Sequence, residues 1–203
     1  MLSIPAPMLA TEGGKPFTDP DWIYEVQLAG YRCMARTGGG QPTELRTKRG
    51  VNCSTWFPEV CTLLSKVTGG PHVIDGGVCV LDDVGRADFG RLQTRARRRS
   101  WVQGADPVTF CAFDILYLAG QSVMALPLIE RKAILQQLLE PLKGQVVVVS
   151  DLPADVELFA RFVPGAGPDG FVAKRLASPY QPGVISPDWK TVTWTGWQDG
   201  RQN

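Results

Sequence analysis

The stretch that decides the fold covers residues 22–36 and reads Trp22-Ile23-Tyr24-Glu25-Val26-Gln27-Leu28-Ala29-Gly30-Tyr31-Arg32-Cys33-Met34-Ala35-Arg36. Its first half alternates like a β-strand, from Trp22 to Leu28. Because successive strand side chains point to opposite faces, Glu25 and Gln27 share one face. Gly30 then turns the chain into a second strand, Tyr31 to Arg36, which predicts a hairpin-rich antiparallel sheet.

The rest of the chain mixes strands and helices without a regular βα repeat, and this predicts an α+β fold: antiparallel sheets flanked by helices. Apolar and alternating runs predict further strands near Leu45 and over residues 72–81, 108–118, 146–149, 171–174 and 189–194. Helical spacing predicts helices over residues 57–64, 88–99, 128–142 and 155–162. We find no internal repeat or linker, so residues 1–203 are expected to form one domain.

Composition limits the functional classes. Lys and Arg number 21 against 20 Asp and Glu, a net charge of +1, so any nucleic-acid contact must come from a local basic patch. The five cysteines form no metal-ligand spacing and are expected to be free thiols in a reducing cytosol. No run is long enough to cross a bilayer. The sequence therefore predicts a cytoplasmic protein with no membrane partner and no metal site.

The segment 25–32 and six further ordered blocks, between about Pro7 and Trp194, resemble the adenylation (nucleotidyltransferase) domain of ATP-dependent DNA ligases of the bacterial repair type. Residues 25–32 resemble the KxDGxR signature, and residues 110–120, 126–132 and 169–180 are similar to the family's AFDLLYLDG, LPLxERK and EGIVAKRxxSPY stretches. Residues 45–59 and 73–82 resemble LxSRNGxxxTxxFPE and LDGEIVxLD, and residues 188–193 resemble DWLKVK. The resemblance implies an ATP-grasp-like adenylation domain, with no OB-fold domain following it within this sequence.

The departures from the family fall at the chemical positions. In the family a lysine takes AMP from ATP, whereas this chain has Gln27 there, and a carboxamide nitrogen is not a comparable nucleophile. Further replacements of charged family residues are Ala29, Gly77, Asp169, Thr191 and Thr193. The resemblance therefore implies that no catalytic residue set is intact and that AMP transfer by the family route is lost.

The resemblance implies four nucleotide-binding candidates: Glu25 and Arg32 at the base or ribose, Phe113 as a stacking ring and Lys174 as a phosphate contact. With the other lysines missing, we expect weak ATP or AMP binding or none, and no certain cofactor. The alternative is purely structural. Glu25 and Arg32 would pair with each other across the predicted hairpin, Phe113 would lie in the core, and Lys174 would be solvated at a strand end.

The strongest basic feature is the cluster Arg91, Arg95, Arg97, Arg98 and Arg99. As a nucleic-acid contact, Arg95 and Arg97 to Arg99 would neutralise backbone phosphates, with Trp101 nearby for stacking. As a structural feature, the cluster would be a solvated helix face.

Three hypotheses for function follow. The first is a catalytically silent ligase-like domain with a binding or scaffolding role in DNA repair, whose partners are DNA or DNA-repair proteins. The second is an active ligase or nucleotidyltransferase that uses another lysine, with Lys174 the nearest by motif. The third is an interaction module that binds no nucleotide.

Overall fold

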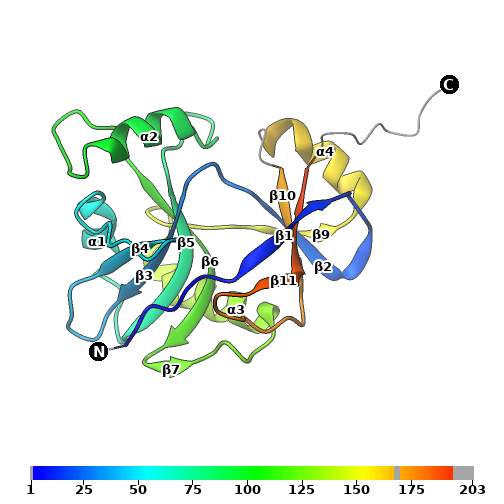
Figure 1. Ribbon diagram of the computed structural model, residues 1–203, viewed down its shortest axis with the longest axis horizontal. Coiled ribbons are helices and arrows are strands. Elements are labelled where there is room, and N and C mark those ends of the chain that lie inside the picture. Colours follow the sequence, from blue (N-terminus) through cyan, green and yellow to red (C-terminus); the bar gives the residue numbers. More distant parts are fainter. Residues whose placement is uncertain (1, 167–169, 194–203) are drawn as a thin grey trace.

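The computed structural model describes residues 2–166 and 170–193, which form two mainly antiparallel β-sheets with helices packed on their outer faces (Figure 1). The first sheet has the order β1 (Leu9–Gly14), β11 (Ile185–Val192), β10 (Phe171–Arg175), β2 (Asp19–Val26) and β9 (Asp151–Ala154). The second has the order β4 (Glu44–Thr47), β3 (Tyr31–Thr37), β5 (His72–Cys79), β6 (Thr109–Leu118) and β7 (Gln121–Ser122), with β8 (Val147–Val148) beside β6. The predicted α+β fold with antiparallel sheets is confirmed, although β1 pairs with β11, and β8 with β6, in parallel.

Each sheet buries one face against helices. The helices α1 (Pro58–Leu64), α2 (Phe89–Arg97) and α3 (Leu128–Leu139) contribute Leu64, Leu92 and Leu135 to the core that lies against the second sheet. A 3-10 turn, η1 (Glu140–Leu142), follows α3. Helix α4 (Val156–Ala166) covers the first sheet, where Phe159 packs against Tyr24 and Phe171. The alternation seen in the sequence thus places Tyr24 on the helix-covered face of β2.

A third apolar cluster joins the two sheets. Met34, Val73 and Leu116 from the second sheet meet Trp189 from β11, together with Met8 and Tyr180. Tyr180 fixes this junction twice, since its hydroxyl accepts a hydrogen bond from the Met8 amide and donates one to Asp75. The inner faces of the two sheets therefore come together in the region where the candidate residues lie.

The predicted hairpin around Gly30 is wrong. Strand β2 pairs with β10 and β9, whereas β3 pairs with β4 and β5, so the two strands belong to different sheets. Gly30 lies at the crossing between them, and a Cβ there would come within 2.6 Å of the Val78 carbonyl oxygen and the Cys79 sulfur. Close approach of the backbone to the end of β5 explains the glycine better than a tight turn does.

The sequence missed β1, β7, β9 and the first half of β11. Pro153 lies within β9 and Pro187 within β11, and proline weakens any strand prediction. Strand β9 is at the edge of its sheet, where a missing backbone donor is tolerated. Asp169 and Trp194 lie outside the described residues. Among residues 2–166 and 170–193, no helix combines the length and apolar character that crossing a bilayer would need.

Candidate nucleotide site between the sheets

Strand alternation divides the side chains of the first sheet between its two faces. Trp22, Tyr24 and Val26 pack in the core under α4, so the alternate residues of β2, Ile23 and Glu25, face the second sheet. The same alternation on β10 and β11 places Lys174 and Trp189 on this inner face. That Gln27 shares a face with Glu25 stays a prediction, because Gln27 lies just beyond the end of β2.

Glu25 is the centre of a buried ion-pair cluster. It is 3% exposed, and its two carboxylate oxygens contact two ammonium groups: Lys132 of α3 at 2.5 Å and Lys174 of β10. Lys132 also donates to the Val149 carbonyl oxygen at 3.2 Å and lies 3.5 Å from Asp151. Glu25 therefore does not pair with Arg32, and the cross-hairpin alternative is wrong.

Lys174 is buried, not solvated. Its ammonium nitrogen lies 4.4 Å from the centroid of the Phe113 ring and 4.2 Å from that of Trp189. Burial lowers the pKa of Lys174 below its ordinary value, against the attraction of Glu25. For Lys132 the balance is reversed: burial opposes its charge, but Glu25 and Asp151 raise its pKa. One carboxylate thus holds two lysines, and the charge of Lys174 is the less favoured.

Arg32 is held by the second sheet. Its Nε and one terminal nitrogen donate to the two carboxylate oxygens of Asp75, at 3.0 and 2.5 Å, and Tyr180 donates to the same carboxylate at 2.6 Å. The guanidinium also lies 5.2 Å from the centroid of the Phe113 ring. The structure thus brings together all four predicted nucleotide residues, Glu25, Arg32, Phe113 and Lys174. Whether they bind a nucleotide stays a prediction.

Sequence reasoning missed several members of this inner network. Asp114 of β6 is fully buried and forms a two-pronged pair with Arg131 of α3, which also donates to the Leu126 and Ser178 carbonyl oxygens. Burial raises the pKa of Asp114, while Arg131 opposes this shift. A signal was present, because Arg131 and Lys132 adjoin apolar positions of an otherwise buried helix face. Their acidic partners are distant in sequence and could not be assigned from it.

Gln27, at the position where the resemblance places a nucleophilic lysine, has a buried side-chain oxygen without a partner among the described residues. Gln27 lies just after β2, and its amide donates to the Gly170 carbonyl oxygen at 3.0 Å. Its side-chain oxygen Oε1 is buried, and it has no hydrogen-bond partner within the described residues. Trp189 Nε1 shares this state. An unpaired buried oxygen costs free energy, so packing alone gives no reason for a carboxamide here.

The residues of β11 near the positions of the family's lysines make contacts outside the inner face. Lys190 lies on the outer face of β11, 4.6 Å from the centroid of the Trp22 ring. Thr191, at one of the lysine positions, accepts a hydrogen bond from the Gly13 amide and donates one to the Thr11 carbonyl oxygen. The four inner cations, Arg32, Arg131, Lys132 and Lys174, each already contact a carboxylate.

The arginine cluster of α2 divides into two kinds. Arg95 is buried, donates to Glu59 and to the Ser100 carbonyl oxygen, and lies over Phe57. Arg91 is exposed but paired with Asp106 at 2.5 Å. Arg97, Arg98 and Arg99 are exposed. Burial removes Arg95 from the candidate nucleic-acid surface, whereas the other three stay candidates.

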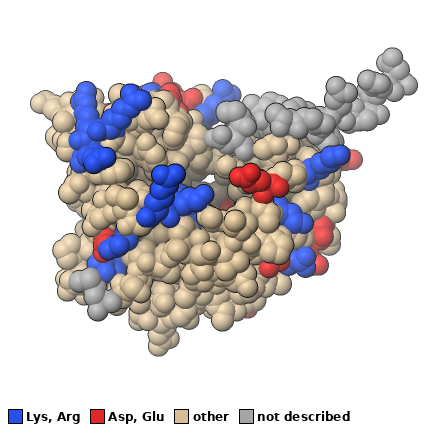
Figure 2. Space-filling view, in the orientation of Figure 1, with Lys and Arg blue, Asp and Glu red and all other residues tan. Residues whose placement is uncertain are grey.

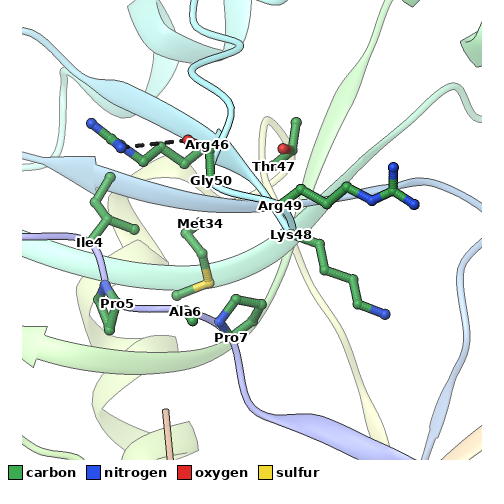
Figure 3. A pocket seen from close by; sticks show the side chains of 10 residues that line it. All are labelled: Ile4, Pro5, Ala6, Pro7, Met34, Arg46, Thr47, Lys48, Arg49 and Gly50. Atoms are coloured by element: carbon green, nitrogen blue, oxygen red, sulfur yellow. Dashed lines mark hydrogen bonds between the residues drawn. The ribbon is translucent and has the colours of Figure 1, made fainter. Parts of the chain in front are cut away.

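A cavity of about 270 Å³ lies outside the inner network, between the N-terminal segment and the turn after β4 (Figure 3). Ile4, Pro5 and Met34 contribute apolar surface, and Lys48 and Arg49 contribute positive charge. Both cations are exposed, and neither has an ion-pair partner in the described part of the chain. This cavity could not be singled out from the sequence, because the segments that form it are far apart along the chain.

Comparison with known proteins gives a consistent picture. The family described as "ATP dependent DNA ligase domain" matches residues 7–192. The multifunctional non-homologous end joining protein LigD of Mycolicibacterium smegmatis is 33% identical over 96% of this chain, but the match spans only 26% of LigD. The ligase-like protein LigB of the SPbeta prophage in Bacillus subtilis is 29% identical over 92% of this chain and 66% of its own.

The solved structures show the same relationship. The ligase domain of Mycobacterium tuberculosis LigD is 29% identical, with a TM-score of 0.79, over 93% of this chain and 60% of that one. A mycobacterial DNA ligase D complexed with ATP and MES has a TM-score of 0.75 and 30% identity over 94% of this chain and 60% of that one. With a family match over residues 7–192 and a fold shared with these ligase domains, this chain belongs to the family of ATP-dependent DNA ligase domains.

Proposed function

We propose that this chain is an adenylation-type ligase domain that does not transfer AMP and that acts as a binding or scaffolding component in DNA repair. The observation that supports the proposal is the residue at the position where the family has its lysine: this chain has Gln27 there, and its Oε1 is buried without a hydrogen-bond partner within the described residues. A carboxamide cannot form the phosphoramidate bond to AMP.

The charge balance of the inner network supports the same proposal. Each of the four inner cations contacts a carboxylate, so a triphosphate would have to break buried ion pairs to gain its own. Breaking a buried pair costs about 3–5 kcal/mol, whereas a charge-assisted phosphate contact contributes about 1.5–3 kcal/mol. ATP binding is therefore expected to be weak or absent.

A DNA partner is supported by the unpaired surface cations. Lys48 and Arg49 reach solvent beside the cavity of Figure 3 without an acidic partner among the described residues. Exposed lysine and arginine side chains of this kind neutralise backbone phosphates and bind DNA without reading its sequence. The curated relative from Mycolicibacterium smegmatis is named as an end-joining protein, which suggests the same setting for this chain.

The test is intact-mass spectrometry after incubation with ATP and magnesium. The wild-type chain is expected to gain no AMP, and a stable adduct of one AMP would overturn the proposal. The same mass measurement is made on Gln27→Lys with Gly77→Glu, a variant that restores the family's lysine and carboxylate at these two positions. The Gly77 position leaves room for a Cβ, which would lie 3.7 Å from its nearest neighbour, the Tyr31 carbonyl oxygen. Binding to nicked DNA that weakens with salt would support the scaffolding role.

One observation favours the alternative of an active enzyme that uses Lys174, namely its lowered pKa, which is a common property of nucleophilic lysines. Its position opposes this alternative. Lys174 pairs with Ile23 in the sheet, whereas Gln27 contacts Gly170, so about 13 Å of strand separates the two positions. Loss of an AMP adduct in Lys174→Ala, with the adduct present in wild type, would establish the alternative.

A further inference from the structure

The end of helix α2 and the segment that follows it combine exposed positive charge with an exposed indole ring. Arg97, Arg98 and Arg99 are exposed, and Trp101 is 55% exposed. In the described residues, none of the three arginines forms an ion pair with an acidic side chain, unlike Arg91 and Arg95 of the same helix. Figure 2 shows Lys and Arg side chains gathered at the end of the molecule where α1 and α2 lie.

The local backbone holds this segment in a defined shape. Arg99 has a φ of 52°, a left-handed conformation that is uncommon for residues other than glycine and ends the helix abruptly. Its guanidinium lies 5.6 Å from the centroid of the partly buried Trp56 ring. The chain therefore presents Trp101 two residues after an arginine that is already fixed on a second indole ring.

We propose that the surface formed by Arg97, Arg98, Arg99, Trp56 and Trp101 binds single-stranded nucleic acid. The arginines would neutralise successive backbone phosphates, and Trp101 would offer its ring face to an unpaired base. A duplex keeps its bases stacked inside, so it would use the arginines but not the indole ring. This chemistry selects single strands over duplexes, and the near-zero net charge of the chain makes such a local patch necessary.

The surface is separate from the inner network between the sheets. Trp56 precedes α1, and Arg97 ends α2, whereas the ion-pair cluster of Glu25 belongs to β2, β10 and α3. The proposal therefore does not depend on whether the inner site binds ATP or transfers AMP. AMP-adduct formation and single-strand binding are measured in separate experiments, so a failure of this proposal is distinguished from a failure of the proposed absence of AMP transfer.

The experiment is fluorescence anisotropy with a fluorescein-labelled oligothymidine and with a labelled duplex of equal length. Wild type is expected to bind the single strand more tightly than the duplex. With two to three phosphate contacts, log affinity should fall against log salt with a slope between about −1.4 and −2. Trp101→Ala should weaken single-strand binding about 5-fold to 100-fold and change duplex binding little.

Two further variants test the arginines. Arg97→Glu with Arg98→Glu should abolish binding of both probes. Lys15→Glu with Arg161→Glu, at two exposed positions outside this surface, lowers the net charge equally and should bind nearly as wild type does. Thermal melting shows whether each variant is folded. Equal binding by Trp101→Ala and wild type, or full competition by polyglutamate at equal charge, would overturn the proposal, the second result pointing to an acidic protein partner.

Discussion

Lys132 Nζ lies 2.5 Å from Glu25 Oε1, a contact between residues 107 positions apart that ties helix α3 to the first sheet. Lys174 shares the same carboxylate, so Glu25→Gln would leave two buried ammonium groups facing a neutral amide. We expect the variant to lose about 3–5 kcal/mol of unfolding free energy in urea titrations. The exposed pair of Glu140 and Lys143 provides the control, since Glu140→Gln should change stability by less than about 0.5 kcal/mol. Similar losses in both variants would contradict this prediction.

The two lysines at Glu25 should not be equivalent. The pKa of Lys132 is raised, whereas burial lowers that of Lys174, so the protein favours the charge of Lys132 more. Lys132→Met is expected to cost about 1–3 kcal/mol. Lys174→Met places an apolar chain against Phe113 and Trp189 and should change stability by less than about 1 kcal/mol. Chemical denaturation of both variants measures the difference, and a larger loss for Lys174→Met would contradict the assignment.

The stability difference between the wild type and Lys174→Met should depend on pH. Because the folded-state pKa of Lys174 lies below its ordinary value of 10.5, the unfolded chain binds more protons at pH values between the two. The wild type should therefore gain stability relative to Lys174→Met as pH rises through the folded pKa towards 10.5, and should lose that gain as pH falls. Glu25 and Lys132 are present in both proteins, so the difference reports the titration of Lys174 together with its coupling to these two neighbours. A difference that does not vary with pH over this window would show that Lys174 keeps its ordinary pKa.

The adjacent glycines Gly76 and Gly77 differ in the space that an added side chain would find. A Cβ at Gly76 would come within 2.7 Å of the Cys111 carbonyl oxygen and the Phe110 ring, whereas at Gly77 the nearest atom is 3.7 Å away. We expect Gly76→Ala to cost about 1–3 kcal/mol through overpacking. Gly77→Glu should fold with a melting temperature close to that of the wild type. Severe destabilisation by Gly77→Glu would mean that this glycine has a structural role.

The sequence predicted the fold because apolar alternation and the family blocks are both carried by packing residues. It failed where a partner strand or partner charge is distant in sequence. Gly30 looked like a hairpin turn, although it carries the chain from one sheet to the other. Glu25 and Arg32 looked like partners, although each pairs with residues that tertiary folding brings to it. The candidate site was thus proposed from the family resemblance, while its internal charge balance required the structure.

Arg95 and Arg98 should differ in their contribution to stability, because Arg95 is buried and Arg98 is exposed. The Arg95 side chain is fully buried, donates to Glu59 and the Ser100 carbonyl oxygen, and covers Phe57. Its Nε is buried without a hydrogen-bond partner within the described residues. Arg95→Ala should remove these contacts and cost about 2–3 kcal/mol, because the arginine stem also fills space against Phe57.

Arg98→Ala should change stability by no more than about 0.5 kcal/mol, because the side chain is exposed and forms no ion pair with a described residue. Thermal and urea unfolding of both variants provide the measurement. If Arg98→Ala destabilised the protein as much as Arg95→Ala does, the exposed arginines would be structural, and their availability to a nucleic-acid partner would be lost as an argument. If Arg98→Ala is as stable as the wild type, any loss of nucleic-acid binding in this variant can be assigned to the missing side chain and not to unfolding.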